Sequence, residues 1–398
     1  MKHQKITHIL TLVLFVLPLA LGLILFVALP DNSFSAEENR SLQTFPKLTW
    51  QSLTEGKFGQ RMNSYFADQF PARDALVGLK GISELVFGKG ENNGVLLGKD
   101  GQLAVRWFDV LLDSKTRVED TDYYSEEMLA QQTDALNTLH ADLAAQGIPL
   151  TVIVPPRTVD VVGAQTRYPA QSTDAFWADF TAGLAPDVQY LDLTDTFQTA
   201  YADGEYVYYR TDHHWTTKGA YMAYQGLMAQ WDREDQTVPV SGQIETVEGF
   251  YGTTWSRAGL KFVGPDQIEI WHYEDEDTYT VTDVETGKSF TGLYNREYLE
   301  KKDKYSAFLD GTHPVLTVTK NTEEDRETLL VLKDSFFNSM APFLAQHYDL
   351  VVIDLSKGLR GTALCDLIAQ YECDGVLIVY NAENMIISNS VATLHYSH

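Results

Sequence analysis

The chain has 398 residues, 44% of them hydrophobic, and a formal net charge of −25 at pH 7. This length suits one large domain with an insertion, or two modest domains, and it allows a sizeable core. The charge argues against nucleic acid as a partner, because phosphate contacts require clustered Lys and Arg, and it would repel an anionic lipid surface. An acidic balance most often means a solvated surface. Affinity for divalent cations is the alternative, and no motif localises it.

The N-terminus carries an apolar run, residues 9–29, which Lys2 and Lys5 precede. A helix needs about twenty such residues to cross a bilayer, whereas a signal-peptide core usually has about 7–15. Residues 33–36 also make a poor cleavage signal. We therefore predict one uncleaved transmembrane helix over residues 1–30 rather than a cleaved signal. Because flanking lysines stay in the cytoplasm, the body after about residue 40 is expected outside the cell.

Residues 31–124 are predicted to form a helical and extended connector that begins the extracytoplasmic domain. Residues 51–89 have a helical pattern, and the glycines between residues 88 and 101 indicate short strands and turns. An amphipathic helix is expected over residues 125–146, with Gly147 as its C-cap. The apolar run at residues 148–154 that follows is typical of a strand buried on both faces of a parallel sheet.

The pattern then repeats as far as the C-terminus. A helix is expected over residues 175–184, and further strands over residues 188–193, 329–332, 350–353 and 376–380. Alternating strands and helices predict a doubly wound parallel sheet over residues 125–398. The alternation of strands and helices is interrupted at about residues 233–326. Segments rich in β-branched and aromatic residues at 238–247, 267–273 and 278–290 predict an antiparallel β insertion or lid there.

The two cysteines, Cys365 and Cys373, lie in or just after a helix expected to start near Thr362. If that helix ran through both, its rise would separate them by roughly 12 Å, which no disulfide spans. If it ended near Gln370, a bridge would be possible, so the sequence leaves their redox state open. The chain is not a disulfide scaffold.

The densest polar cluster is Asp212, His213 and His214, just before a helix that Thr216 or Thr217 would cap. An Asp beside a His fixes the tautomer and frees the other ring nitrogen to take a proton. In an extended loop Asp212 and His214 would share a side, with His213 pointing the opposite way. Two alternatives stay open: the His rings bond backbone carbonyls, or all three residues bind a metal, although no His-x-x-x-His pair or nearby Cys completes such a site.

A second cluster places Ser335 after the strand at residues 329–332 and before a helix. Open α/β sheets carry their sites at the carboxyl ends of their strands, where a serine has both its Oγ and its backbone N–H at the crevice. The alternative is that Asp334 or Ser335 merely caps the helix that follows.

Several spaced motifs accompany these clusters in one order, at residues 34–40 with Pro46, 68–73, 98–101, 212–215, 303–311 with His313 and Pro314, and 333–335. On these residues the chain resembles the DHHW family of Gram-positive surface proteins. That family is similar to the alginate O-acetylation proteins and, more distantly, to the SGNH hydrolases. The resemblance covers nearly the whole chain beyond the anchor.

The resemblance implies that Ser335 is a nucleophile, His214 its base and Asp212 the group that orients the base. The relatives carry glycine before Asp-Ser, where this chain has Lys333, and lysine does not easily adopt a positive φ. Further contacts to substrate or oxyanion are expected from Asn338, His213, Arg157 and His313; capping or packing equally explains Asn338 and His313.

The sequence thus predicts an SGNH-like α/β fold that transfers O-acyl groups to a cell-surface polysaccharide, or removes them from it, without metal or cofactor. The resemblance also implies a membrane-bound O-acyltransferase partner that delivers acyl groups across the bilayer. The alternative from a different class is a non-catalytic surface protein that binds or assembles carbohydrate, with an idle triad. A metal-dependent hydrolase is a third hypothesis.

Overall fold

The computed structural model describes residues 2–35, 37, 40–106, 124–166, 170, 172–322, 324–358, 363–394 and 396. Part of the motif at residues 34–40 and the helix start expected near Thr362 lie outside these residues. The chain divides into two units, Met1–Asn93 with Ser256–Phe262, and Gly94–Trp255 with Val263–His398. The domain boundaries predicted at residues 30 and 124 stay predictions.

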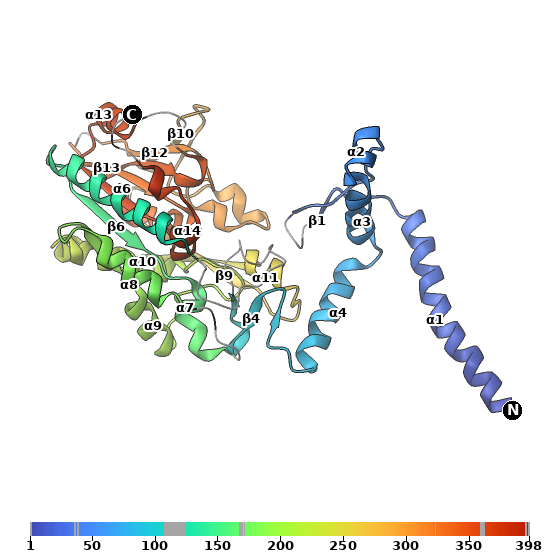
Figure 1. Cartoon of the computed structure of the whole chain (residues 1–398). Helices are drawn as coiled ribbons and strands as arrows, with labels where there is room; N and C mark the ends of the chain where they lie inside the picture. Colours follow the sequence, from blue (N-terminus) through green and yellow to red (C-terminus); the bar gives the residue numbers. More distant parts are fainter. Residues whose placement is uncertain are drawn as a thin grey trace. The chain divides into compact units, whose positions relative to one another are not determined.

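The first unit begins with α1 (Lys2–Ala28), whose segment Leu10–Ala28 is long and apolar enough to cross a membrane. It continues through β1 (Phe34–Ser35), β2 (Arg40–Ser41), α2 (Trp50–Thr54), α3 (Lys57–Gln69), α4 (Arg73–Val86) and β3 (Glu91–Asn92), coloured blue in Figure 1. The helical pattern at residues 51–89 is thus split into three helices. The breaks fall at Gly56 and Ala72, both of which adopt a left-handed φ, and Pro71 adds a second reason at the later break.

The second unit is built on an eight-stranded sheet in the order β11-β10-β12-β14-β13-β15-β6-β7. Five strands are mutually parallel, and each matches an expected apolar run: β6 (Leu150–Val154), β7 (Gln189–Asp192), β13 (Thr328–Lys333), β14 (Asp349–Asp354) and β15 (Gly375–Val379). The alternation of side chains along each strand divides the core into two clusters, one on each face.

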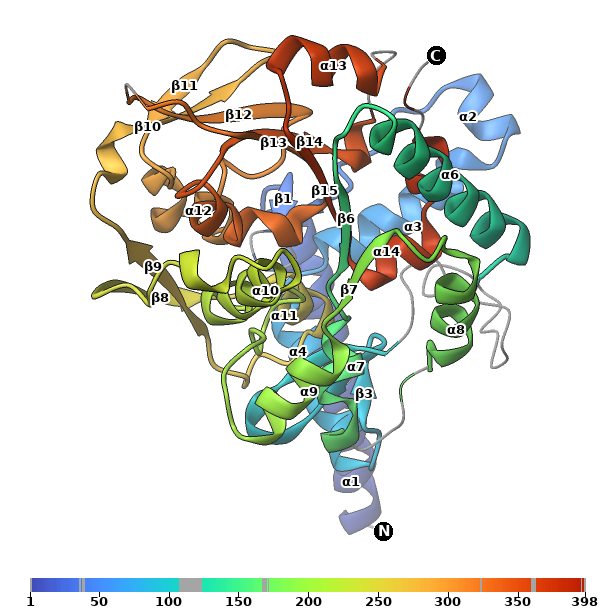
Figure 2. The same ribbon diagram turned by 90° about the vertical axis from the view of Figure 1, so that its left-hand side faces the viewer.

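Helices cover both faces of this sheet, as a doubly wound fold requires. One face carries α6 (Glu126–Ala144), α8 (Asp174–Gly183), α13 (Leu364–Tyr371) and α14 (Ala382–Ile387). The other carries α7 (Thr158–Val162), α9 (Thr194–Ala202), α10 (Thr217–Gln230) and α12 (Ala341–Leu344). Figure 2 shows α6 and α8 on one side of β6 and α10 and α12 on the other. The predicted α/β class is confirmed.

The β-rich insertion has two parts. The strands β8 (Gln243–Phe250) and β9 (Asp266–His272) form a separate antiparallel pair. The strands β10 (Tyr279–Asp283), β11 (Ser289–Thr291) and β12 (Val315–Lys320) instead extend the main sheet through the antiparallel pairing of β12 with β14. Most of the later insertion therefore extends the edge of the main sheet and is not a lid. It pairs with β14 because the backbone N–H and C=O groups along the outer edge of that strand would otherwise have no partner strand.

The remaining elements are short. The glycine-rich segment forms the antiparallel pair β4 (Val95–Leu97) and β5 (Leu103–Val105), and α11 (Thr253–Ala258) follows β8. The helix α13 ends at Tyr371, before the second cysteine, and Glu372 caps it with a left-handed φ. Cys365 and Cys373 are both free thiols, and Cys373 is buried. Burial raises the pKa of the Cys373 thiol to about 12.

Candidate active site

Two loops bring the predicted residues to the carboxyl edge of the main sheet. One leads into α10, where Thr216 is the N-cap and accepts a hydrogen bond from the Gly219 N–H at 3.1 Å. The loop folds back on itself, because Tyr208 pairs with Trp215 in an isolated bridge. The other loop follows β13 and carries Ser335 as the first residue of a short 3₁₀ helix. Strand ends of this kind are where open α/β sheets place their sites.

Asp212, His214 and Ser335 form a continuous hydrogen-bonded chain. The Asp212 Oδ1 lies 2.5 Å from the His214 Nδ1, and the His214 Nε2 lies 2.6 Å from the Ser335 Oγ. Asp212 and His214 are buried, whereas Ser335 is partly exposed. A carboxylate on one ring nitrogen fixes the tautomer that leaves the other nitrogen ready to accept the serine proton. The arrangement has the geometry of an activated nucleophile.

The Asp212 carboxylate is held from both sides. Its Oδ2 accepts hydrogen bonds from the Thr253 N–H at 2.8 Å and the Thr253 hydroxyl at 3.0 Å. Burial opposes ionisation, but the neighbouring His213 and His214 rings and these hydrogen bonds outweigh it and hold the pKa of Asp212 below its usual range. The approach is close: a Cβ added to Gly252 would lie 2.3 Å from the Asp212 Cβ. Only glycine fits there.

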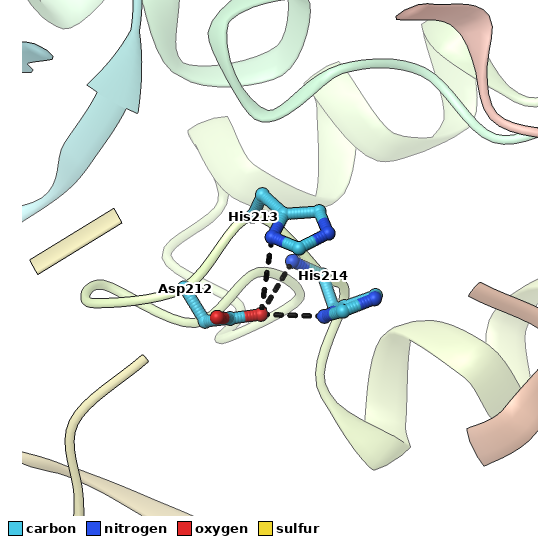
Figure 3. Close-up of side chains that lie close together, drawn as sticks. All are labelled: Asp212, His213 and His214. Carbon is cyan, nitrogen blue, oxygen red and sulfur yellow. Dashed lines mark hydrogen bonds and ion pairs between the residues drawn. The ribbon is translucent and has the colours of Figure 1, made fainter. Parts of the chain in front are cut away.

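His213 does not point away from His214, as an extended loop would require. The two rings lie 3.8 Å apart by their centroids, and both lie beside the Asp212 carboxylate (Figure 3). The expectation of opposite sides was wrong, because residues 210–214 form a bend rather than an extended segment. The His213 Nδ1 bonds the Thr253 hydroxyl at 2.8 Å, so among the three residues only His214 bonds the serine.

The turn that carries Ser335 is fixed by the residue before it. The buried Asp334 accepts hydrogen bonds from the Phe336 N–H, the Asn381 N–H and the Asn384 amide, at 3.0, 2.6 and 2.8 Å. Burial raises the pKa of Asp334, although these donors oppose the shift. Asp334 therefore caps the 3₁₀ helix and joins it to α14, while Ser335 is left free for the contact with His214.

Tyr305 was not predicted as a site residue, yet it contacts both halves of the site. Its ring stacks on the His214 imidazole, with 3.9 Å between centroids and 11° between planes. Its hydroxyl donates to the Ser335 carbonyl oxygen at 3.0 Å. Tyr305 lies within the motif at residues 303–311, so a signal was present in the sequence, but nothing local indicated that this motif packs against the His loop.

Lys333, where the resemblance predicts glycine, fits its position without strain. It lies inside β13, and it is not among the residues with a positive φ. Its side chain is 1% exposed and pairs with the buried Asp354 at 2.9 Å. Lys333 thus forms a buried ion pair with Asp354, and it does not disturb the backbone of the turn that carries Ser335.

The other predicted contacts are engaged elsewhere. Asn338 donates its amide to the Gly311 carbonyl oxygen at 3.1 Å. Arg157 is buried and pairs with Asp160 through two nitrogens, at 2.9 and 2.5 Å. Both nitrogens of His313 lie about 3 Å from acceptors on Asp283 and Asp310. None of the three bonds the Asp212–Ser335 chain, and their roles toward a substrate stay predictions.

Asp212, His213 and His214 are also the group of described residues that could offer ligands to a metal. The Asp212 Oδ1 and the His214 Nδ1 lie 2.5 Å apart. Two ligands of a tetrahedral zinc with bonds of about 2.0–2.1 Å would lie about 3.3 Å apart. The distance fits a hydrogen bond, and it is too short for these two atoms to be ligands of one tetrahedral zinc. The geometry therefore favours the acid–base hypothesis over the metal hypothesis.

Two family models match the chain. The model described as DHHW protein matches residues 197–353, which contain all three residues of the hydrogen-bonded chain. The model described as SGNH hydrolase-like domain, acetyltransferase AlgX, matches residues 110–264. No curated protein matches the chain.

Solved structures share the fold. A DHHW family protein from Eubacterium siraeum is 20% identical, with a TM-score of 0.55, over 76% of this chain and 99% of that one. Bacillus cereus PatB1 is 18% identical, with a TM-score of 0.55, over 68% of this chain and 93% of that one. PatB1 with a sulfonyl adduct is 20% identical, with a TM-score of 0.56, over 74% and 98%. The predicted resemblance is confirmed, although a Gram-positive origin stays a prediction. Over the matched residues the chain is similar to the DHHW family and to the SGNH hydrolase-like acetyltransferases.

Proposed function

We propose that this chain is a serine-dependent O-acyltransferase or acyl esterase that acts on a cell-surface polysaccharide outside the cytoplasm. The observation that carries the proposal is the continuous chain from Asp212 through His214 to the partly exposed Ser335 Oγ, with contacts of 2.5 and 2.6 Å. The relation to the SGNH hydrolase-like acetyltransferases supports an acyl group as the group transferred.

In the first half of the reaction His214 Nε2 takes the proton of the Ser335 hydroxyl as Oγ attacks the acyl carbonyl carbon. The carbonyl π electrons move to oxygen, which becomes an oxyanion. When the tetrahedral intermediate collapses, the bond to the leaving oxygen breaks and His214 returns its proton to that oxygen. An acyl ester of Ser335 remains, and Asp212 stays ionised throughout.

The oxyanion needs a preorganised donor. The backbone N–H of Ser335 has no acceptor within the part of the chain that the structure describes, and it lies at the start of the 3₁₀ helix. We assign it the role of one oxyanion donor, because an N–H at this position is not used for capping. The neighbouring Phe336 N–H is bonded to Asp334 and is not available.

In the second half His214 takes a proton from a sugar hydroxyl or from water, whose oxygen attacks the acyl-serine. Collapse returns the proton to the Ser335 Oγ and frees the new ester or the acid. Transferase and esterase therefore share one set of residues and differ only in which hydroxyl reaches the acyl carbon.

The test uses the full chain in detergent with a simple acetyl ester such as p-nitrophenyl acetate. Wild-type protein should hydrolyse the ester, and Ser335→Ala should lose the activity while its melting temperature stays near the wild-type value. The matched control is Ser289→Ala, which removes an exposed serine hydroxyl from β11. Equal activity in wild type and Ser335→Ala would contradict the proposal.

The location outside the cytoplasm is part of the proposal, and α1 supports membrane attachment. Protease added to intact cells should remove a C-terminal tag while a cytoplasmic control protein survives. Protection of the tag, under conditions where a known surface protein is cut, would contradict it. A membrane-bound partner that delivers acyl groups stays a prediction.

A further inference from the structure

The edge of the main sheet opposite to Ser335 also carries a pocket. A pocket of about 260 Å³ opens where β6, β7, β13 and β15 begin, and residues after α10 close it. Strand β13, with six residues, separates this pocket from the nucleophile turn, which at a rise of about 3.3 Å per residue is on the order of 20 Å. Because drug-sized ligands occupy pockets of about 300–1,000 Å³, this one suits a single small ring.

One wall of the pocket is a hydrogen-bonded relay. The Trp231 indole N–H donates to the Thr151 hydroxyl at 2.8 Å, and that hydroxyl donates to the Gln189 Oε1 at 2.8 Å. The relay fixes the Gln189 amide by its oxygen. The amide nitrogen of Gln189 has no partner among the described residues, so two N–H groups are held in place and remain available to a ligand.

Arg233 supplies a second preorganised donor to the pocket. The Nη1 of Arg233 donates to Glu327 at 3.0 Å and to the Tyr348 hydroxyl, and its guanidinium lies 5.7 Å from the centre of the Tyr348 ring. No acceptor for its Nε or Nη2 occurs within the described ranges. A guanidinium fixed on one side offers its remaining donors with little further loss of conformational freedom.

The charge of the lining narrows the ligand class. The lining contains one cation, Arg233, and three carboxylates, those of Asp232, Glu327 and Asp374, so the formal charge of the pocket is net negative. An anionic ligand would be repelled. Fixed N–H donors, carboxylate acceptors and the aromatic rings of Trp231 and Tyr348 together suit a neutral ring that carries several hydroxyl or acetamido groups.

We propose that this pocket binds a neutral sugar residue and is a glycan subsite separate from Ser335. The inference that the pocket holds the polysaccharide modified by Ser335 rests on the proposed function. The binding of a neutral sugar to the pocket does not depend on that function. A subsite some 20 Å from the nucleophile, by the rise of β13, contacts a different residue of the polymer from the one that reacts.

The test measures binding of neutral tetrasaccharides of β-1,4-glucose, α-1,4-glucose and β-1,4-N-acetylglucosamine to the full chain by calorimetry and saturation-transfer NMR. At least one should bind, and tetragalacturonate, which is anionic, should not. Arg233→Met and Gln189→Leu should each weaken binding at least about tenfold, as expected when a fixed donor is lost from a polar site. The control is Arg296→Met, which breaks an arginine–glutamate pair outside the pocket.

Ser335→Ala should bind the same tetrasaccharide unchanged, which separates the two proposals. If Ser335→Ala bound the tetrasaccharide as wild type does and also hydrolysed the acetyl ester at the wild-type rate, the proposed function would be contradicted and the proposed sugar site would stand. Four results would overturn the pocket: no binding of any of the three, preference for the anionic probe, unchanged binding in both pocket variants, or loss of binding in Ser335→Ala. Melting temperatures near the wild-type value show that each variant is folded.

Discussion

The carboxyl edge and the amino edge of the main sheet each carry a row of three hydrogen-bonded side chains. The two rows differ in their middle and last members. At the carboxyl edge the row runs Asp212, His214, Ser335 and ends on a partly exposed hydroxyl. At the amino edge it runs Trp231, Thr151, Gln189 and ends on an amide. Only the first row contains a titratable base between a charge and a nucleophile, so only it can move a proton.

The difference shows that a fixed hydrogen-bond row does not by itself make an active site. The same sheet supports both rows, because parallel strands bring their starts to one edge and their ends to the other. Chemistry requires that the middle member accept a proton near neutral pH, as histidine does and threonine does not. Changes to the carboxyl edge should therefore alter rates by orders of magnitude, and changes to the amino edge should alter binding only.

The largest effect is expected from removing the base. His214→Ala should lower kcat for an acetyl ester by about 10⁴–10⁶, because an unactivated serine hydroxyl is a weak nucleophile. His213→Ala, which removes the ring next to it, should cost about tenfold or less, since His213 bonds Thr253 and not Ser335. Steady-state kinetics with melting curves on both variants provide the measurement. Equal large losses at unchanged stability would instead favour a joint role for the two rings.

Asp212→Asn should cost somewhat less activity, about 10³–10⁴, because the base would remain but its tautomer would not be fixed. It should also change how stability depends on pH. The folded state lowers the pKa of Asp212, so its contribution is fully present above the unfolded value of about 3.9 and is lost as the pH falls through the folded pKa.

Denaturant unfolding of wild type and Asp212→Asn between pH 7 and pH 2 measures this contribution. The wild-type advantage in free energy of unfolding should be steady down to about pH 4 and should shrink below it. An advantage that grows as the pH falls would mean that folding favours the protonated carboxyl, and the orientation of His214 by a carboxylate would then be untenable.

A smaller effect is expected at Tyr305, which supports the row without belonging to it. When His214 accepts the serine proton it becomes a cation against the Tyr305 face, an interaction of about 0.5–2 kcal/mol. Tyr305→Leu should lower kcat by about tenfold to a hundredfold with little change in KM, since the ring also fixes the imidazole plane. Tyr305→Phe keeps the ring and should recover most of the rate. Equal losses in both would assign the effect to the hydroxyl instead.

The parallel strands could be predicted because strands buried on both faces appear as continuous apolar runs, as in β6 and β15. The pairing of β12 with β14 could not, because alternation along a strand says which face is buried but not which neighbour lies beside it. The apolar pattern of the insertion is equally consistent with a separate sheet and with an extension of the main one.

The candidate site could be predicted where its residues lie close together in the sequence or directly follow a recognisable strand. Asp212 and His214 are two residues apart, and Ser335 follows a strand that ends at a predictable edge. The contacts that hold them come from distant segments: Tyr305 on His214, and Gly252 and Thr253 on Asp212. The close approach of the His213 and His214 rings depends on the bend at residues 210–214. That segment contains no glycine or proline from which a bend could be predicted. The pocket at the amino edge joins residues from six separate segments, which no local pattern reveals.

A covalent acyl-serine is tested most directly by intact-mass measurement of the full chain after brief incubation with an activated acetyl ester, followed by peptide mapping. We expect one added acetyl group on Ser335 in wild type and in Arg233→Met, and none in Ser335→Ala. His214→Ala should form the adduct far more slowly. An adduct of equal amount in Ser335→Ala and wild type, or equal rates of ester hydrolysis by the two proteins, would contradict a covalent acyl-serine and with it the catalytic role of the carboxyl edge.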